Sequence, residues 1–349
     1  MYTPLVCRRP NNNKVYLFFT CIQLTLIAGV RADSVGWDTA NYVEYYHMVD
    51  RSSNIVDLLK NTTNWIEPGY FIMCYLVKLL GGNAQVSLVV AGLIIYGLIL
   101  NFIYKYSYNP IMGVLTIFCF PVFYDSLSMM RNAIVCAIFA WSIKYIESRK
   151  LSCYLICTVI AMCFHNIALL FIPLYFVSFI KWRRWYSPLL VVAATLLVYT
   201  NIVSIVSWLA SSLSDYNDLY GGGKTFWFGT DSGGLKTAIM YFVIVMFAYY
   251  LYSNYHHGRR KKQDILVGYA LILPSAAFCY MTAAMFIRIM LMMMPIAGVF
   301  ITNEIESIRD MKIRCIFKLG MVFLLIVFQV FTLWVNAENY VPYIPFWKA

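Results

Sequence analysis

The chain has 349 residues, of which 61% are hydrophobic and only 12% are charged. Soluble domains carry about 25% charged residues, so this composition excludes an ordinary water-soluble globular protein. A formal net charge of +11 would favour nucleic acid as the partner of a soluble protein, but basic residues also concentrate in the cytoplasmic loops of membrane proteins. We therefore expect an all-α, polytopic integral membrane protein whose partner is the lipid bilayer and not nucleic acid.

Apolar runs predict about 11 transmembrane helices, with a range of 10–12, in a single transmembrane domain over residues 1–349. The runs lie at residues 15–30, 84–104, 111–124, 129–147, 152–164, 167–180, 188–209, 237–253, 265–283, 287–303 and 317–336. Several are shorter than the roughly 20 residues that a helix needs to cross a bilayer. The first run could also be a signal peptide, but no small-residue cleavage site ends it. Pro68–Leu80 is short and apolar, and we expect an interfacial or re-entrant helix there.

The distribution of charge predicts the orientation of these helices. With a cytoplasmic N-terminus, 18 of the 27 basic residues fall on the cytoplasmic side, as the positive-inside rule requires. Two long polar loops then lie outside, at about residues 31–67 and 211–236. A full span at Pro68–Leu80 would invert every later helix and violate the same rule.

Three polar side chains interrupt apolar runs and are candidates for function, because charge at membrane depth is expensive. They are Arg131, His165 and Arg288, and in this threading each lies at the external end of its helix. Asp38 and Arg31 lie on the same side. Structural roles remain open: Arg288 snorkelling to the headgroups, His165 capping a helix, and Asp38 and Arg31 forming a solvated pair.

These residue types suit glycosyl transfer from a lipid pyrophosphate. The planar forks of Arg131, Arg288 and, more weakly, Arg31 match phosphate oxygens. His165 could accept a proton from a sugar hydroxyl, with Asp38 orienting it or acting as the base itself. We expect the second external loop to be a lid over the sugar groove, with Asp215, Asp218 and Trp227 as candidate sugar contacts.

The same segments resemble a family. Gly36-Trp37-Asp38-Thr39-Ala40-Asn41-Tyr42 is similar to the GxDxxxY signature of EpsG-like, Wzy-type polysaccharide polymerases. Met130-Arg131-Asn132-Ala133-Ile134 resembles the RxxxA helix of that family, and Ala161–Asn166 resembles its AxxFHxSA element. Arg288 matches the arginine that the family carries late in the chain, and Tyr340–Tyr343 resembles its terminal PY. Asn166 departs from the usual serine.

The resemblance implies an all-helical membrane glycosyltransferase of the bacterial inner membrane with its active face on the periplasmic or external side. It implies transfer of a growing glycan from undecaprenyl pyrophosphate to a new lipid-linked oligosaccharide repeat unit, with no cofactor or metal and with a chain-length regulator as a possible partner protein. Two alternatives remain: an O-antigen ligase using the same donor, and a polysaccharide flippase or exporter. An exporter would carry charges deep within several helices, whereas here they gather at one end.

Overall fold

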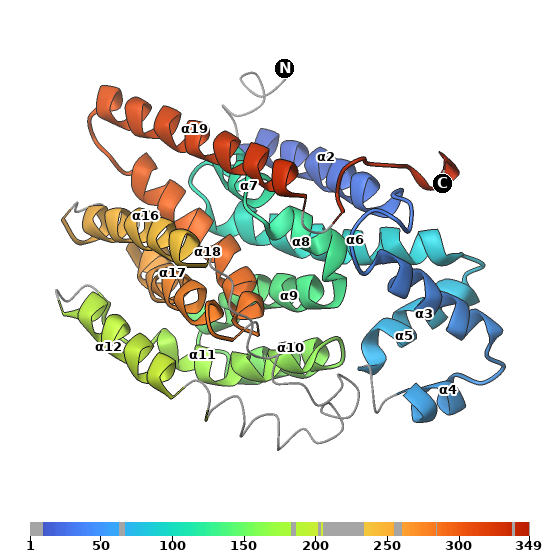
Figure 1. The fold of residues 1–349 in the computed structure, drawn as a ribbon. Coiled ribbons are helices and arrows are strands. Elements are labelled where there is room, and N and C mark those ends of the chain that lie inside the picture. Colours follow the sequence, from blue (N-terminus) through green and yellow to red (C-terminus); the bar gives the residue numbers. More distant parts are fainter. Residues whose placement is uncertain are drawn as a thin grey trace. The chain divides into compact units, whose positions relative to one another are not determined.

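The computed structural model describes residues 10–62, 67–182, 186–201, 204, 234–254, 260–283, 285–336 and 339–348. Within these residues the secondary structure is helical, apart from an isolated antiparallel bridge between Arg31 and Pro345 (Figure 1). The expected all-α, polytopic class is confirmed.

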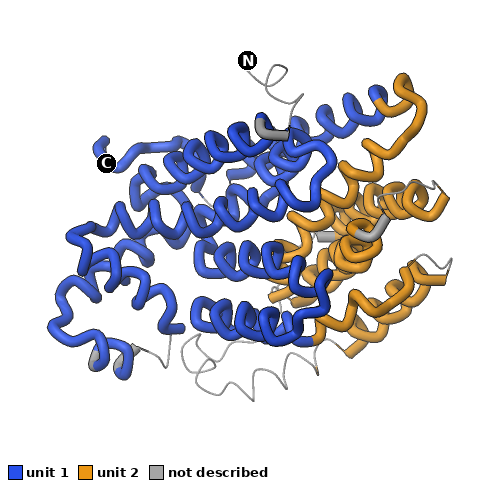
Figure 2. The backbone as a smooth tube through the Cα atoms, turned by 180° about the vertical axis from the view of Figure 1, so that it is seen from behind, with its two compact units in different colours: residues 1–172, 315–349 blue, residues 173–314 orange. Residues whose placement is uncertain are grey.

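The chain divides into two compact units, one of residues 1–172 and 315–349 and one of residues 173–314 (Figure 2). We call them unit 1 and unit 2 and describe each by itself. The expected single domain over residues 1–349 remains a prediction.

Unit 1 is built mainly from helices of the N-terminal half. They are α2 (Pro10–Gly29), α3 (Thr39–Arg51), α4 (Ile55–Thr62), α5 (Pro68–Leu79), α6 (Ala84–Tyr106), α7 (Pro110–Cys119), α8 (Val122–Ser128), α9 (Met130–Glu147), α10 (Leu151–Met162) and the short η1 (Asn166–Leu170), followed much later by α19 (Met311–Val335) and η2 (Phe346–Lys348). Helix α6 packs against both α2 and α9, and α9 packs against α10. The four therefore form the core of this unit.

Unit 2 contains α12 (Ser187–Thr200), α16 (Gly234–Asn254), α17 (Arg260–Tyr280) and α18 (Phe286–Glu306), and α11 (Phe171–Val177) crosses its boundary. Helices α16, α17 and α18 pack against one another, and α12 packs on α17. Thr195 donates to Ser275 across the α12–α17 contact, at 2.7 Å.

Among the described residues, five helices are long and apolar enough to cross a membrane: α6, α16, α17, α18 and α19. The bent pair of α7 and α8 makes a sixth if it is one broken span. Pro121 explains the break in the run expected at 111–124: proline has no N–H to donate, and the two helices meet at 49°. Four shorter apolar helices are also present, so the number of 11 spans remains a prediction.

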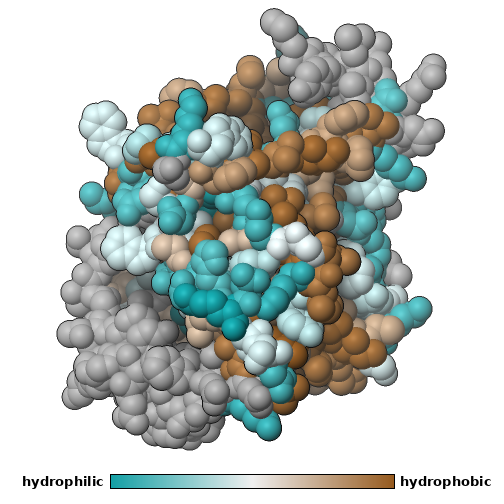
Figure 3. Space-filling model, turned by 90° about the vertical axis from the view of Figure 1, so that its right-hand side faces the viewer, coloured by the Kyte–Doolittle hydropathy of each residue, from teal (hydrophilic) through white to brown (hydrophobic). Residues whose placement is uncertain are grey.

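The segment expected as a long polar loop at 31–67 contains two helices, α3 and α4. Helix α3 is amphipathic, because Thr39, Tyr42, Tyr46 and Val49 recur at helical spacing and are all buried. Its opposite face bears exposed charges such as Glu44. On the face of the molecule that carries α3 and α5, hydrophilic side chains gather in a patch (Figure 3).

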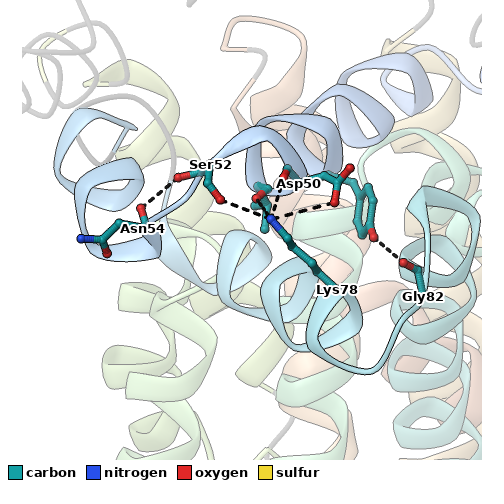
Figure 4. A network of polar contacts seen from close by, with 7 residues as sticks. Asp50, Ser52, Asn54, Lys78 and Gly82 are labelled. Carbon is teal, nitrogen blue, oxygen red and sulfur yellow. Dashed lines mark hydrogen bonds and ion pairs between the residues drawn. The ribbon is translucent and has the colours of Figure 1, made fainter.

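Lys78 on α5 fixes the end of α3. Its Nζ donates to the carbonyl oxygens of Val49 at 3.1 Å, Asp50 at 2.6 Å and Ser52 at 3.2 Å (Figure 4). A cation that hydrogen-bonds the last carbonyls of a helix also complements its dipole. On the neighbouring turn of α3, Tyr46 donates to the carbonyl of Gly82. These bonds hold α3 on α5, the helix that begins at the site described next.

Candidate functional site

The centre of the site in unit 1 is Glu67, whose side chain is only 6% exposed. One carboxylate oxygen, Oε2, accepts from Nη1 of Arg131 at 2.6 Å. The other, Oε1, accepts from the backbone N–H of Asn166 at 2.9 Å and lies 3.5 Å from Nδ1 of His165. A buried carboxylate needs such partners to remain charged. Glu67 therefore joins Arg131 and His165, two of the three candidates that interrupt apolar runs.

The start of α5 explains why Glu67 is placed there. Pro68 occupies the first position of the helix, where its missing N–H is of no consequence. The N–H of Gly69 donates to the carbonyl of Cys163 at 2.6 Å, and a Cβ on Gly69 would lie only 2.6 Å from that oxygen. Glycine thus permits the close approach of α5 to the end of α10, which brings Glu67 to His165.

Arg131 lies in the first turn of α9, with 18% of its side chain exposed. Its backbone N–H donates to the hydroxyl of Tyr42 at 3.4 Å. Burial raises the pKa of Tyr42 to about 12, with Arg131 acting in the opposite direction and Asp38 in the same direction as burial. The phenol therefore stays protonated at neutral pH, and its hydroxyl lies within the electrostatic influence of both candidates.

The Gly36-Trp37-Asp38 turn docks on the residues that precede α9. Gly36 has φ of +87°, and a Cβ there would lie 2.8 Å from the carbonyl oxygen of Leu127. The N–H of Trp37 donates to Oγ of Ser128 at 2.9 Å. This geometry explains the glycine of the motif, since a side chain would be strained and would clash.

Asp38 is half-buried at the N-cap of α3, and the Asn41 amide donates to its Oδ1 at 3.3 Å. It lies near Tyr42, whose pKa it raises. A carboxylate that does lie near His165 is that of Glu67, whose Oε1 is 3.5 Å from Nδ1.

Arg31 is fully buried. Its guanidinium donates to the carbonyl oxygens of Ala28 and Leu127, the latter at 2.9 Å, and to Oγ1 of Thr39 at 3.2 Å. A solvated pair with Asp38 is therefore wrong as an interpretation of this residue. These contacts tie the end of α2 to Leu127 in α8, three positions before α9 begins at Met130.

His165 follows α10 and precedes η1, with 12% of its side chain exposed. Its Nδ1 accepts from the N–H of Ile167 at 3.2 Å, so the capping role left open by the sequence is present. The same nitrogen faces Glu67. The two contacts need opposite states of Nδ1, because it must be unprotonated to accept from Ile167 and protonated to donate to Glu67.

Arg288 belongs to unit 2, where it is half-buried in the first turn of α18. Its backbone N–H donates to the carbonyl of Met285 at 3.2 Å. The antiparallel order of α17 and α18 puts Arg288 at the end of unit 2 where α17 finishes, opposite Glu304 and the start of α17. Asp215, Asp218 and Trp227 lie outside the described residues.

Unit 1 has a second group of charges at the other end of the same helices. Lys105 Nζ lies 3.0 Å from Glu147 Oε2, which also accepts from the hydroxyl of Tyr106 at 2.7 Å. Lys14 near the start of α2 lies over the ring of Tyr104. The 18-residue α9 separates Glu147 from Arg131 by about 25 Å.

The EpsG family matches residues 14–345, nearly the whole chain. The chain belongs to the EpsG family. No curated protein and no solved structure matches it. Membership of the EpsG family supports a general role in polysaccharide polymerisation, carried out by a membrane-embedded protein.

Sequence reasoning missed Glu67, the residue at the centre of this site. The sequence pattern places Glu67 at the end of a polar loop. It lies before an apolar run and does not interrupt one, so it lacks the contrast that marks Arg131 and His165. An acidic residue directly before Pro68-Gly69 at the start of that helix was the available signal. Only the fold reveals that Glu67 meets Arg131 and His165.

Proposed function

We propose that this EpsG-family protein is a glycosyltransferase that polymerises lipid-linked oligosaccharide repeat units. In this proposal the donor is a growing glycan on undecaprenyl pyrophosphate, and the acceptor is a new lipid-linked repeat unit. The observation that carries it is the meeting of Arg131, Glu67 and His165, from three different helix ends, at the end of unit 1 opposite Lys105 and Glu147.

Arg131 of unit 1 is the first candidate to bind the donor pyrophosphate in this proposal, and Arg288 of unit 2 is the second candidate for binding phosphate oxygens. A guanidinium stays charged at any physiological pH and donates in a fork that matches phosphate oxygens. As the sugar–phosphate bond breaks, negative charge grows on the pyrophosphate, and the arginines stabilise it. Arg31 was the weaker candidate for this role. Because its guanidinium already donates to Leu127 and Thr39, its contribution to donor binding is to hold the start of α9.

The acceptor hydroxyl attacks the anomeric carbon of the donor sugar next to the pyrophosphate. A new C–O bond forms to that carbon, the old C–O bond to phosphate breaks, and its electron pair leaves with the pyrophosphate. The hydroxyl proton passes to a base, for which His165 and Asp38 are the candidates. Asp215, Asp218 and Trp227 are the proposed sugar contacts, and a chain-length regulator protein is the proposed partner.

The proposed location is the bacterial inner membrane, with the N-terminus in the cytoplasm and the Arg131 end facing the periplasm or the outside. Lys14, Lys105 and Glu147 gather at one end of α2, α6 and α9, and basic residues mark the cytoplasmic side. Nucleotide sugars are absent outside the cell, so a lipid-linked donor fits the opposite end.

Deletion of the gene in its host, followed by gel analysis of the surface glycan, tests this function. We expect single repeat units in the deletion and a restored ladder with the wild-type gene. Arg131→Ala, His165→Ala and Arg288→Ala should each be detected in the membrane, Arg131→Ala at a reduced level, and none should restore the ladder. Glycan of normal length in the deletion would overturn the polymerase, whereas normal chains that stay on the lipid carrier would favour the ligase.

A further inference from the structure

Glu67 lies where it can control the protonation of His165. Its Oε1 is 3.5 Å from Nδ1 of His165, and Oε2 is held by Arg131 at 2.6 Å. The N–H of Asn166 fixes Oε1 at 2.9 Å, so the carboxylate cannot rotate away without losing that bond. With 6% exposure, water does not screen these contacts strongly.

The two contacts of Nδ1 correspond to two tautomers of a neutral imidazole. If Nδ1 accepts from Ile167, its lone pair is engaged in that bond and the proton sits on Nε2. If Nδ1–H donates to Glu67, Nε2 carries the lone pair instead. Only the second tautomer presents a basic nitrogen on the side of the ring remote from Glu67.

We propose that Glu67 is a positioning residue, which selects the His165 tautomer with a basic Nε2 and orients Arg131 at the same time. This inference rests on the proposed function, because it assigns His165 as the base of that reaction. Proton transfer from the acceptor hydroxyl to Nε2 creates an imidazolium, and the negative charge of Glu67 next to Nδ1–H stabilises it. Carboxylates that hold the second nitrogen of a catalytic histidine do the same in unrelated enzymes.

The same carboxylate couples His165 to the donor side. Arg131 approaches Glu67 through Nη1, and a guanidinium has five N–H donors, so one guanidinium can pair with a carboxylate and a phosphate oxygen at the same time. One residue thereby sets the spacing between the group that binds the leaving pyrophosphate and the group that takes the proton.

Glu147 offers a matched control. Like Glu67, it accepts from one cation and one neutral donor, Lys105 and Tyr106, but at the opposite end of α9. Glu67→Gln and Glu147→Gln remove the same charge from carboxylates with the same kinds of partner, although Glu147 is the more exposed of the two. Glu67→Asp keeps the charge and shortens the side chain by one methylene.

The experiment uses the full chain in nanodiscs with lipid-linked repeat units extracted from the gene-deletion host. We expect Glu67→Gln to lower kcat on the order of 100-fold, at the low end of what a general base contributes. Loss of the negative charge should also move the acid limb of the rate–pH profile about one unit lower, because the imidazolium is less stable. Glu67→Asp should recover part of kcat and the position of the limb, and Glu147→Gln should match wild type. A lower kcat with an unmoved limb, or an unaffected Glu67→Gln, overturns the inference.

Nitrogen NMR of histidine-labelled protein separates this inference from the proposed function. The chain has four histidines, and His165→Ala identifies the His165 signals. We expect a protonated Nδ1 in wild type and titration at lower pH in Glu67→Gln, whether or not the protein elongates glycans. If wild type does not elongate but the NMR difference is present, only the polymerase proposal fails. An identical tautomer and titration in both proteins overturns the role of Glu67.

Discussion

The two ends of α9 carry similar ion pairs in different surroundings. At one end, Lys105 and Glu147 are 40% and 18% exposed. At the other, Arg131 and Glu67 are 18% and 6% exposed, and Glu67 also contacts the segment after α10. The Lys105–Glu147 pair is a partly exposed pair of the kind that orients a membrane protein. The Arg131–Glu67 pair belongs to a buried network that links three parts of the chain. Burial and connectivity, and not charge alone, therefore distinguish the candidate site.

Removing the arginine of the buried pair should have the largest effect. Arg131→Ala leaves Glu67 as a buried charge without this partner, which should destabilise the fold by about 3–5 kcal/mol. Adding Glu67→Gln to Arg131→Ala should restore membrane protein levels but not glycan elongation. Protein levels and glycan ladders are measured together. Equal levels for the single and double variants would show that Arg131 and Glu67 are not coupled. The buried pair would then not differ from the exposed pair in this respect.

A second effect concerns the turn that docks before α9. Gly36→Ala adds a methyl at φ of +87°, 2.8 Å from the Leu127 oxygen, and should destabilise the protein by about 1–3 kcal/mol. Gly81→Ala is the control, because Gly81 has φ of +75° but nothing lies within 4 Å of a Cβ there. Thermal unfolding in detergent compares them. If both lower the transition temperature equally, backbone strain alone explains the effect and the close docking on Leu127 does not.

A smaller effect is expected for the hydroxyl that meets the backbone of Arg131. Tyr42→Phe removes the acceptor at 3.4 Å while keeping the ring contact with Tyr70, whose centroid is 5.1 Å away. We expect a loss of about 1 kcal/mol in stability and a modest fall in elongation rate. Since burial holds the pKa of Tyr42 near 12, the wild-type contact should not titrate between pH 5 and 9. A rate–pH profile that changes in Tyr42→Phe within this range would contradict that assignment.

The smallest effect should come from the exposed pair. Lys105→Ala should change stability by less than about 1 kcal/mol, because water and salt screen partly exposed ion pairs. Its glycan ladder should match wild type. A loss of elongation as severe as that of Arg131→Ala would remove the distinction between the two ends.

The sequence predicted much of the helical order. Expected runs at 84–104, 129–147 and 287–303 lie within helices α6, α9 and α18, whose ends differ by at most a few residues. Apolar runs of this length leave few alternatives in a bilayer. The pattern did not predict α3 within the polar segment, because two of its four buried residues are tyrosines, which score as weakly hydrophobic.

The site was predicted less completely. Arg131 and His165 stood out because they interrupt apolar runs, but Glu67 follows a polar segment and gave no such contrast. Arg31 was expected to bind phosphate, and its buried contacts with Ala28 and Leu127 could not be foreseen from a position just after a span. Such long-range contacts depend on tertiary packing, which the local pattern does not encode.

The most direct test of the account is elongation by the purified protein. Wild type, Arg131→Ala and Lys105→Ala are placed in nanodiscs with lipid-linked repeat units from the gene-deletion host, and the products are separated by length. The account predicts long chains with wild type and Lys105→Ala, and single units with Arg131→Ala. Single units with folded wild type, or long chains with Arg131→Ala, would contradict it.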